Sequence, residues 1–313
     1  MAHYNSFKDE IILEKRGSKL RAHRQITIQA RRTLVAYSFL IVPLLFFLAI
    51  RIYPTLYAFV MAFSEKGTGD FSLVNFERLL TDTVFWKALL NTFLYVIITV
   101  PIQLGLGLLI ALAIEKVRRF KWLYRTIYFL PYITSVVAVS WVWKLMYDKD
   151  YGLFNEFLGW FGITPQTWLN DPKLALLCIS ALMIWQSIGF SMLIFMAGLQ
   201  VIPKSFYEAA QIDGSNSWSM FWKITFPLLN PTLVFLVVTG VIEALQTFTQ
   251  VQNLAGSTGG PLNSTVSIAV YMYKVAFLEF NMVYAAAIAI VLFLVILIVT
   301  IIQMKVLNKN YEY

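Results

Sequence analysis

Six long apolar stretches, separated by polar segments, dominate the hydrophobic pattern along the chain. The hydrocarbon core of a bilayer is about 30 Å thick, and a helix needs about 20 apolar residues to cross it. Because each stretch has about that length, the pattern predicts an all-α, polytopic membrane protein with six transmembrane helices. The predicted spans are residues 34–53 (interrupted at Pro43), 92–114, 128–147, 174–199, 228–249 and 283–304.

The composition agrees with a membrane protein. The sequence is 59% hydrophobic and 13% charged, whereas soluble domains average about 45–50% apolar and about 25% charged residues. One cysteine and two histidines exclude an intrachain disulfide and are too few for a metal or catalytic site built on these residues. We therefore expect no bound metal and no catalytic residues in this chain.

Lysine and arginine residues are distributed unevenly among the predicted loops. With the amino terminus inside the cell, 17 of the 25 basic residues lie on the cytoplasmic side, which is the bias that sets the orientation of membrane proteins. The net charge of +8 therefore reflects membrane topology and does not indicate a nucleic-acid partner. We expect a cytoplasmic tail over residues 1–32, a transmembrane domain over residues 33–306 and a cytoplasmic carboxy-terminal tail over residues 307–313.

The polar segment between the fourth and fifth predicted spans contains two short amphipathic patterns. Pro203 can open the first helix, because a first-turn proline lacks only a donor that would be unpaired anyway. Gly214 can end it, because glycine readily adopts the left-handed conformation that closes a helix. A second apolar face follows and ends at Pro227. The segment is therefore predicted to form two short helices in an L along the cytoplasmic membrane surface.

This segment also carries a motif of spaced residues, which consists of Glu208, Ala209, Ala210, Asp213, Gly214, Ile224 and Pro227. The motif resembles the EAA loop of permeases from binding-protein-dependent ABC importers, which corresponds to residues 203–231 here. Two positions depart from the family pattern, because Ser215 stands where alanine is usual and Phe226 stands where leucine is usual. The alternative interpretation is a generic interfacial helix between two spans.

The resemblance implies a mechanical role for the loop. In that family the EAA loop is the coupling helix that docks into a cleft on a separate ATPase subunit. Glu208 would contact a basic residue of the ATPase, and Ala209 and Ala210 would let the helix approach closely. Asp213 and Gly214 would hold the turn. The chain itself has no Gly-x-x-x-x-Gly-Lys-Ser/Thr sequence and so lacks the phosphate-binding loop of such ATPases.

The resemblance also implies an assembly. It extends from the first to the sixth predicted span and is closest to the carbohydrate-uptake branch of the family, of maltose and glycerol-phosphate type. A member of that branch is a multi-pass protein of the bacterial cytoplasmic membrane that pairs with a second, homologous permease subunit. Two ATPase subunits, which would hold ATP and Mg²⁺, and an extracellular solute-binding protein would complete the importer. The substrate would be an oligosaccharide or a sugar derivative, and this chain would be a transport subunit with no cofactor of its own.

Polar side chains inside the predicted spans are candidates for the substrate pathway, because they are costly in lipid and normally face a cavity or a partner helix. In the fifth span, spacings of three and four residues place four of them on one helical face. These four are Glu243, Gln246, Thr247 and Gln250, and the candidate set is completed by Asn253, Trp185, Gln186 and Trp141. Amides and carboxylates can bind sugar hydroxyls, and aromatic rings can stack on sugar faces. The alternative role is interhelical hydrogen bonding, worth about 0.6 kcal/mol per contact.

Two other functions predict different sequence features. An ion-coupled secondary transporter of a small polar solute would need an ion site near the membrane midplane and often contains inverted repeats. Glu243 is the one acidic residue deep in a predicted span, and the sequence contains no repeat. A membrane-embedded enzyme would need clustered histidine, acidic or serine residues near one interface, and the sequence contains no such cluster.

Overall fold

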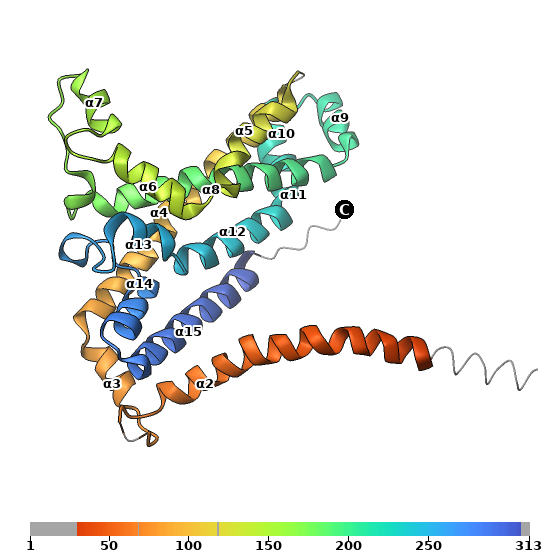
Figure 1. Cartoon of the computed structure of the whole chain (residues 1–313). Coiled ribbons are helices and arrows are strands. Elements are labelled where there is room, and N and C mark those ends of the chain that lie inside the picture. Colours follow the sequence, from red (N-terminus) through yellow and green to blue (C-terminus); the bar gives the residue numbers. More distant parts are fainter. Residues whose placement is uncertain (1–29, 68, 118, 308–313) are drawn as a thin grey trace, which may run out of the picture. The chain divides into compact units, whose positions relative to one another are not determined.

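The computed structural model describes residues 30–67, 69–117 and 119–307, and most of them lie in helices (Figure 1). This part of the chain contains an isolated β-bridge between Ser64 and Phe71. The chain divides into two compact units, Met1–Val60 and Met61–Tyr313. The two predicted tails fall largely outside the described ranges.

The first unit carries one long helix, Ala30–Ala62, which continues just past the unit boundary and is long and apolar enough to cross a membrane. The predicted interruption at Pro43 is wrong, because the helix continues through that residue. Its irregularity is the π-turn η1 (Leu48–Ile52), which is followed by α2 (Tyr53–Ala62). Pro54 explains this position, because a proline lacks the N–H donor and clashes with the carbonyl one turn earlier, and a π-turn gives its ring room.

Three further predicted spans are continuous helices in the second unit. They are α4 (Thr83–Lys116), α8 (Ala175–Val201) and α15 (Met282–Leu307). α4 starts earlier than predicted because Asp82 caps it, and the carboxylate accepts hydrogen bonds from the amides of Val84 and Phe85. Such a cap satisfies two of the unpaired donors at a helix start.

The third predicted span is not a continuous helix. It is divided into α5 (Lys121–Ile133) and α6 (Val136–Met146), which meet at 93°. Pro131 lies in the last turn of α5 and weakens it, because proline has no N–H to donate. The Ser135 side chain then starts α6 by accepting a hydrogen bond from the amide of Ala138. The single helix predicted over this region is therefore wrong.

The fifth predicted span bends at its start and breaks at its end. The helical stretch Ser217–Leu228 meets α12 (Asn230–Leu245) at 64°. The next helix, α13 (Thr249–Ala255), begins after a non-helical break at residues 246–248. Within the described residues, four helices are therefore long and apolar enough to cross a membrane, and up to six spans exist if each bent pair counts as one.

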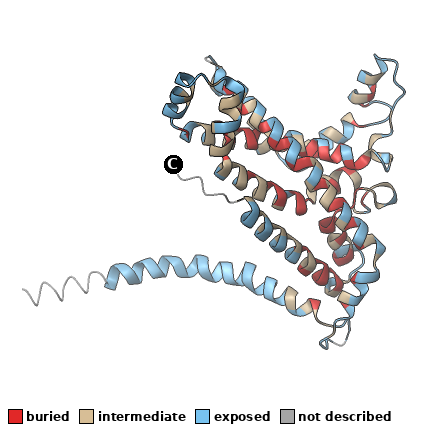
Figure 2. Ribbon diagram, turned by 180° about the vertical axis from the view of Figure 1, so that it is seen from behind, coloured by how far each residue is buried: buried red, intermediate tan, exposed pale blue. Residues whose placement is uncertain are grey.

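The core of the second unit forms where α8 packs against α4, α5 and α12, and Figure 2 shows buried residues gathered in the interior of this unit. Two glycines permit the close approach. A Cβ added at Gly107 of α4 would lie 2.7 Å from the Cβ of Ser191, and one added at Gly189 of α8 would lie 1.9 Å from the carbonyl oxygen of Tyr128. Small residues at such positions let membrane helices pack backbone against backbone.

Short helices make the connections of this unit. Between α8 and α12 lie α9 (Lys204–Ile212), α10 (Ser217–Met220), the π-turn η3 (Phe221–Thr225) and α11 (Phe226–Leu228). The remaining short elements are α3 (Val74–Thr81), α7 (Leu153–Gly159), η2 (Trp168–Asn170), η4 (Pro261–Asn263), α14 (Ile268–Tyr273) and η5 (Lys274–Leu278).

Candidate functional site

The EAA-like segment, residues 203–231, consists of short helices joined by a turn. We call this segment the elbow. Its first arm is α9, which Figure 1 shows at one end of the bundle beyond the end of α8, and α9 has no buried residue. Glu208 and Ala209 are exposed and Ala210 is partly exposed. Pro203 stands immediately before the helix as its N-cap. The Glu-Ala-Ala sequence is therefore at the surface of this chain, within reach of a partner protein.

The turn after α9 is held by backbone hydrogen bonds. The Asp213 amide donates to the Ala209 carbonyl at 3.0 Å. The Ser215 amide donates to the Ala210 carbonyl at 2.9 Å. Gly214 lies between them with a φ of +75°, a conformation that residues with a Cβ rarely adopt. The chain thus leaves α9 at the glycine, and the Asp213 side chain is exposed.

The second arm of the elbow consists of α10, η3 and α11, and it differs from the prediction at Pro227. The sequence predicts a helix that ends there, but α11 continues through Pro227 to Leu228 and the bend follows at Leu229. The π-turn before it explains the difference. The Phe226 amide donates to the carbonyl of Phe221, and this wider turn accommodates the proline ring.

The predicted polar face of the fifth span is divided by the break at residues 246–248. Glu243 lies in the last turn of α12 and is exposed, as is Gln246. Thr247 is buried instead, and its hydroxyl donates to the Oε1 atom of Gln250 at 3.5 Å. The prediction of one continuous helical face is therefore wrong.

The break in the fifth span has a cause far away in the sequence. The Ser267 hydroxyl donates a hydrogen bond of 2.6 Å to the Thr247 carbonyl. A carbonyl bonded in this way no longer needs a helical N–H partner, because each buried backbone group requires only one satisfactory bond. After the break, the side-chain amide of Asn253 donates to the Thr249 carbonyl at 2.8 Å within α13.

The remaining candidate pathway residues lie on α6 and α8. Trp141 is exposed, and the Nζ atom of Lys144 lies 5.0 Å from its ring centroid. Trp185 is also exposed and packs against Trp143 with ring centroids 5.6 Å apart. Gln186, the next residue along α8, is buried. Consecutive positions on α8 therefore face different surroundings.

Tyr132 is a polar aromatic residue near Glu243 that sequence reasoning missed. It interacts electrostatically with Glu243, and its ring stacks on Phe190 with centroids 4.8 Å apart. The two aromatic residues come from α5 and α8, close to the bend between α5 and α6. The signal present in the sequence was a tyrosine directly after Pro131 inside an apolar stretch.

A polar cavity of about 720 Å³ is lined in part by the segment that precedes α7, and Figure 1 shows α7 and α9 at opposite ends of this unit. The cavity includes lysines and aspartates, so both charge signs are present. The amides of Tyr151 and Asp150 donate to the carboxylate of Asp148 and hold its pKa below the ordinary value. The lining residues come from segments 144–150, 167–170 and 254–261.

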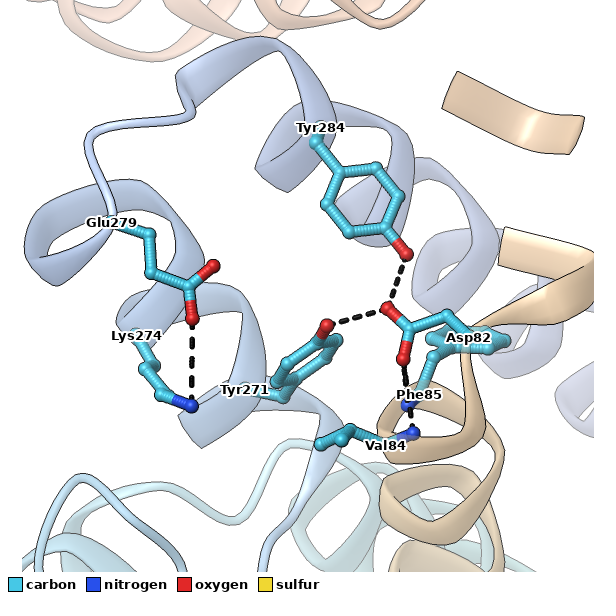
Figure 3. A network of polar contacts seen from close by, with 7 residues as sticks. All are labelled: Asp82, Val84, Phe85, Tyr271, Lys274, Glu279 and Tyr284. Atoms are coloured by element: carbon cyan, nitrogen blue, oxygen red, sulfur yellow. Dashed lines mark hydrogen bonds and ion pairs between the residues drawn. The ribbon is translucent and has the colours of Figure 1, made fainter. Parts of the chain in front are cut away.

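Asp82 is the centre of a hydrogen-bonded network that joins α4 to α14 and α15 (Figure 3). Its Oδ2 atom accepts hydrogen bonds of 2.5 Å from the hydroxyls of Tyr271 and Tyr284. Its Oδ1 atom accepts the amides of Val84 and Phe85 at 2.9 and 3.0 Å. Partial burial raises the pKa of Asp82, but the hydrogen bonds from the two tyrosines and the two amides outweigh it, so the pKa lies below the ordinary value.

No group of three or more histidine, cysteine, aspartate or glutamate residues that could hold a metal ion occurs in the described part of the chain. The polar side chains of the elbow, of the break at residues 246–248 and of the cavity lie in three different places and do not form one cluster. They suit recognition of a partner or of a polar solute.

Comparisons with known proteins agree with this arrangement. The sequence profile of the family described as "Binding-protein-dependent transport system inner membrane component" matches residues 103–313. The lactose transport system permease protein LacF of Rhizobium radiobacter is 37% identical over 247 residues, which are 78% of this chain and 81% of LacF. The arabinooligosaccharides transport system permease protein AraP of Halalkalibacterium halodurans is 32% identical over 289 residues, which are 91% of either chain.

Solved structures share the fold. A chain from a bacterial ABC transporter involved in the import of the acidic polysaccharide alginate has a TM-score of 0.78 at 23% identity, over 91% of this chain and all of that one. The sequence match to the family profile and the two relatives together identify the family. The chain therefore belongs to the inner membrane components of binding-protein-dependent transport systems.

Proposed function

We propose that this chain is the permease subunit of an ATP-driven ABC importer and forms half of the translocation pathway for a sugar or oligosaccharide. The observation that carries the proposal is the unburied α9, with Glu208 exposed at one end of the bundle. Relatives named for the transport of lactose, arabinooligosaccharides and sn-glycerol-3-phosphate support a sugar or sugar derivative as the cargo.

α9 is the proposed contact with a separate ATPase subunit. The exposed Glu208 carboxylate would pair with a basic residue of that subunit, and such pairs fix the register of an interface. Ala209 and Ala210 offer no bulky side chain and allow close approach. Asp213 and Gly214 belong to the turn that ends α9, and Pro227 lies in α11 just before the bend at Leu229; together they would set the angle of the elbow. Two ATPase subunits carrying ATP and Mg²⁺, together with a second, homologous permease subunit, would complete the membrane assembly.

Glu243 and Gln246 are the proposed lining of the substrate pathway. A charged side chain at the centre of a span costs about 2.5–3.5 kcal/mol when it enters lipid, so the exposed Glu243 should face the pathway or the partner permease. Tyr132 adds an aromatic ring and a hydroxyl nearby. The other residues that we keep in this proposal are Thr247, Gln250, Asn253, Trp185, Gln186 and Trp141.

The cavity of about 720 Å³ is the proposed contact for the extracellular solute-binding protein. α9 and both chain termini would then lie on the cytoplasmic side of the bacterial cell membrane. The excess of basic residues in the same predicted loops supports this orientation. Lysines and aspartates in one cavity suit a protein surface that presents both charge signs.

Uptake by the reconstituted complex tests the proposal. The chain would be co-purified with its partner permease, ATPase and solute-binding protein and placed in lipid vesicles. Sugar uptake should require ATP and persist when ionophores remove proton and sodium gradients. Uptake that follows an ion gradient and ignores ATP would support the alternative, an ion-coupled secondary transporter, and would contradict the proposal.

A further inference from the structure

α9 is attached to the rest of the chain by few interactions. Its ends are held through the backbone, by the Pro203 start and by the turn at Gly214. Among the residues of α9, all of which are described, only Tyr207 makes a side-chain hydrogen bond to another element. Its hydroxyl lies 3.0 Å from the Oγ1 atom of Thr225. Apart from the backbone and the packing of its partly buried residues Tyr207 and Ala210, α9 is therefore tied to the rest of the elbow by this pair.

The direction of this hydrogen bond follows from the surroundings of Thr225. The threonine is 5% exposed, and its hydroxyl donates to the Met220 carbonyl at 3.4 Å. A hydroxyl has one hydrogen, so Oγ1 has only lone pairs left for Tyr207. Tyr207 is consequently the donor, and the chain runs from Tyr207 to Thr225 to the Met220 carbonyl.

The π-turn η3 determines which way Thr225 faces. The turn holds one residue more than an α-helical turn, and each residue rotates an α-helix by about 100°. An uninterrupted α-helix would therefore present a different side of Thr225 to α9. Directly after the π-turn come α11 and the 16 residues of α12. α12 ends with the turn that carries Glu243 and rises about 24 Å along its axis.

We infer that Tyr207 and Thr225 are positioning residues that transmit displacement of α9 to α12. This inference rests on the proposed docking of α9 on an ATPase subunit. With the hydrogen bond intact, the two arms of the elbow move as one body, so a push on α9 displaces α12 and Glu243. Without it, α9 turns about Pro203 and Gly214, and the same push is absorbed at these two joints.

Sugar imported per ATP hydrolysed, measured in the complete reconstituted complex with sugar-loaded binding protein, tests the inference. Tyr207→Phe removes only the donor, and Thr225→Val removes the acceptor with little change in shape. Each variant should lower the ratio by about fivefold, the factor that one ordinary hydrogen bond contributes. Thr225→Ser loses a methyl group but keeps the hydroxyl, and it should keep the native ratio. If packing alone mattered, Thr225→Ser would lower the ratio as well. A normal ratio in both Tyr207→Phe and Thr225→Val would overturn the inference.

Two controls separate this result from others. Tyr124→Phe removes a hydroxyl from a 44% exposed tyrosine of α5 and should leave the ratio unchanged; a drop equal to that of Tyr207→Phe would contradict a specific role for the pair. Cross-linking of Gln211→Cys, an exposed position of α9 outside the proposed Glu208 contact, to the ATPase subunit tests the docking itself. If the cross-link forms and the ratio stays normal in both Tyr207→Phe and Thr225→Val, only the inference fails. If no cross-link forms, the docking and the inference built on it both fail.

Discussion

Replacement of Asp82 by asparagine should destabilise the contact between α4, α14 and α15. Asparagine keeps one side-chain oxygen and caps a helix about as well as aspartate, so the start of α4 should survive. The second oxygen becomes an amide NH₂, which cannot accept the hydroxyls of Tyr271 and Tyr284. Hydrogen bonds to a charged group contribute about 1.5–3 kcal/mol each. Because Asp82 is partly exposed and solvent screens its charge, we expect a loss of about 3 kcal/mol.

Thermal unfolding of the purified protein in detergent measures this loss. Asp150→Asn makes the same chemical change at an exposed position and should change stability by no more than about 0.5 kcal/mol. Tyr271→Phe removes one of the two donors, so the double variant with Asp82→Asn should lose less than the sum of the single losses. If the Tm of Asp82→Asn equals that of Asp150→Asn, the network does not stabilise the fold and the reasoning is refuted.

Two more predictions follow from the same structure. Hydrogen bonds outweigh burial and lower the pKa of Asp82 in the folded protein from its ordinary value of 3.8. The stabilisation from these bonds is therefore fully present above about pH 5, and it is lost as the pH falls through the pKa of Asp82 in the folded protein. The difference in unfolding free energy between the native protein and Asp82→Asn should therefore narrow below pH 3.8; a constant difference down to pH 2, about two units lower, would contradict the assigned role. Gly189→Ala would place its Cβ 1.9 Å from the Tyr128 carbonyl, and this overpacking should cost at least about 1–3 kcal/mol in thermal unfolding. Gly105→Ala, where nothing lies within 4 Å, should leave stability unchanged or raise it by up to about 1 kcal/mol, and equal Tm values for the two variants would contradict the packing described.

The continuous spans could be predicted from the sequence because their signal is local. α8 and α15 are uninterrupted apolar stretches, and their length alone indicates membrane helices. The breaks were not predictable in this way. Residues 246–248 leave the helix partly because Ser267, twenty positions later, binds the Thr247 carbonyl, and hydropathy contains no information about such a contact. The same limit applies to Asp82, whose tyrosine partners lie 189 and 202 residues away.

The elbow was located by its motif, but its internal geometry was not. Gly214 has the left-handed conformation that its residue type predicts. Pro227 is the counterexample, because a proline normally interrupts a helix, yet the π-turn before it lets the helix continue. A regular period of 3.6 residues misplaces the side chains at the end of such a turn and after it. For that reason the sequence did not reveal that Thr225 faces Tyr207.

Stimulation of ATP hydrolysis in a Glu208→Lys variant is the most direct measurement of what α9 does. The variant complex would be purified with its partner permease, ATPase subunits and solute-binding protein, and its subunit composition would be checked before the assay. Reversal of the charge on an exposed residue should leave assembly intact but abolish the rise in ATP hydrolysis caused by sugar-loaded binding protein. A fully assembled Glu208→Lys complex with normal stimulation would contradict the assignment of α9 as the coupling element.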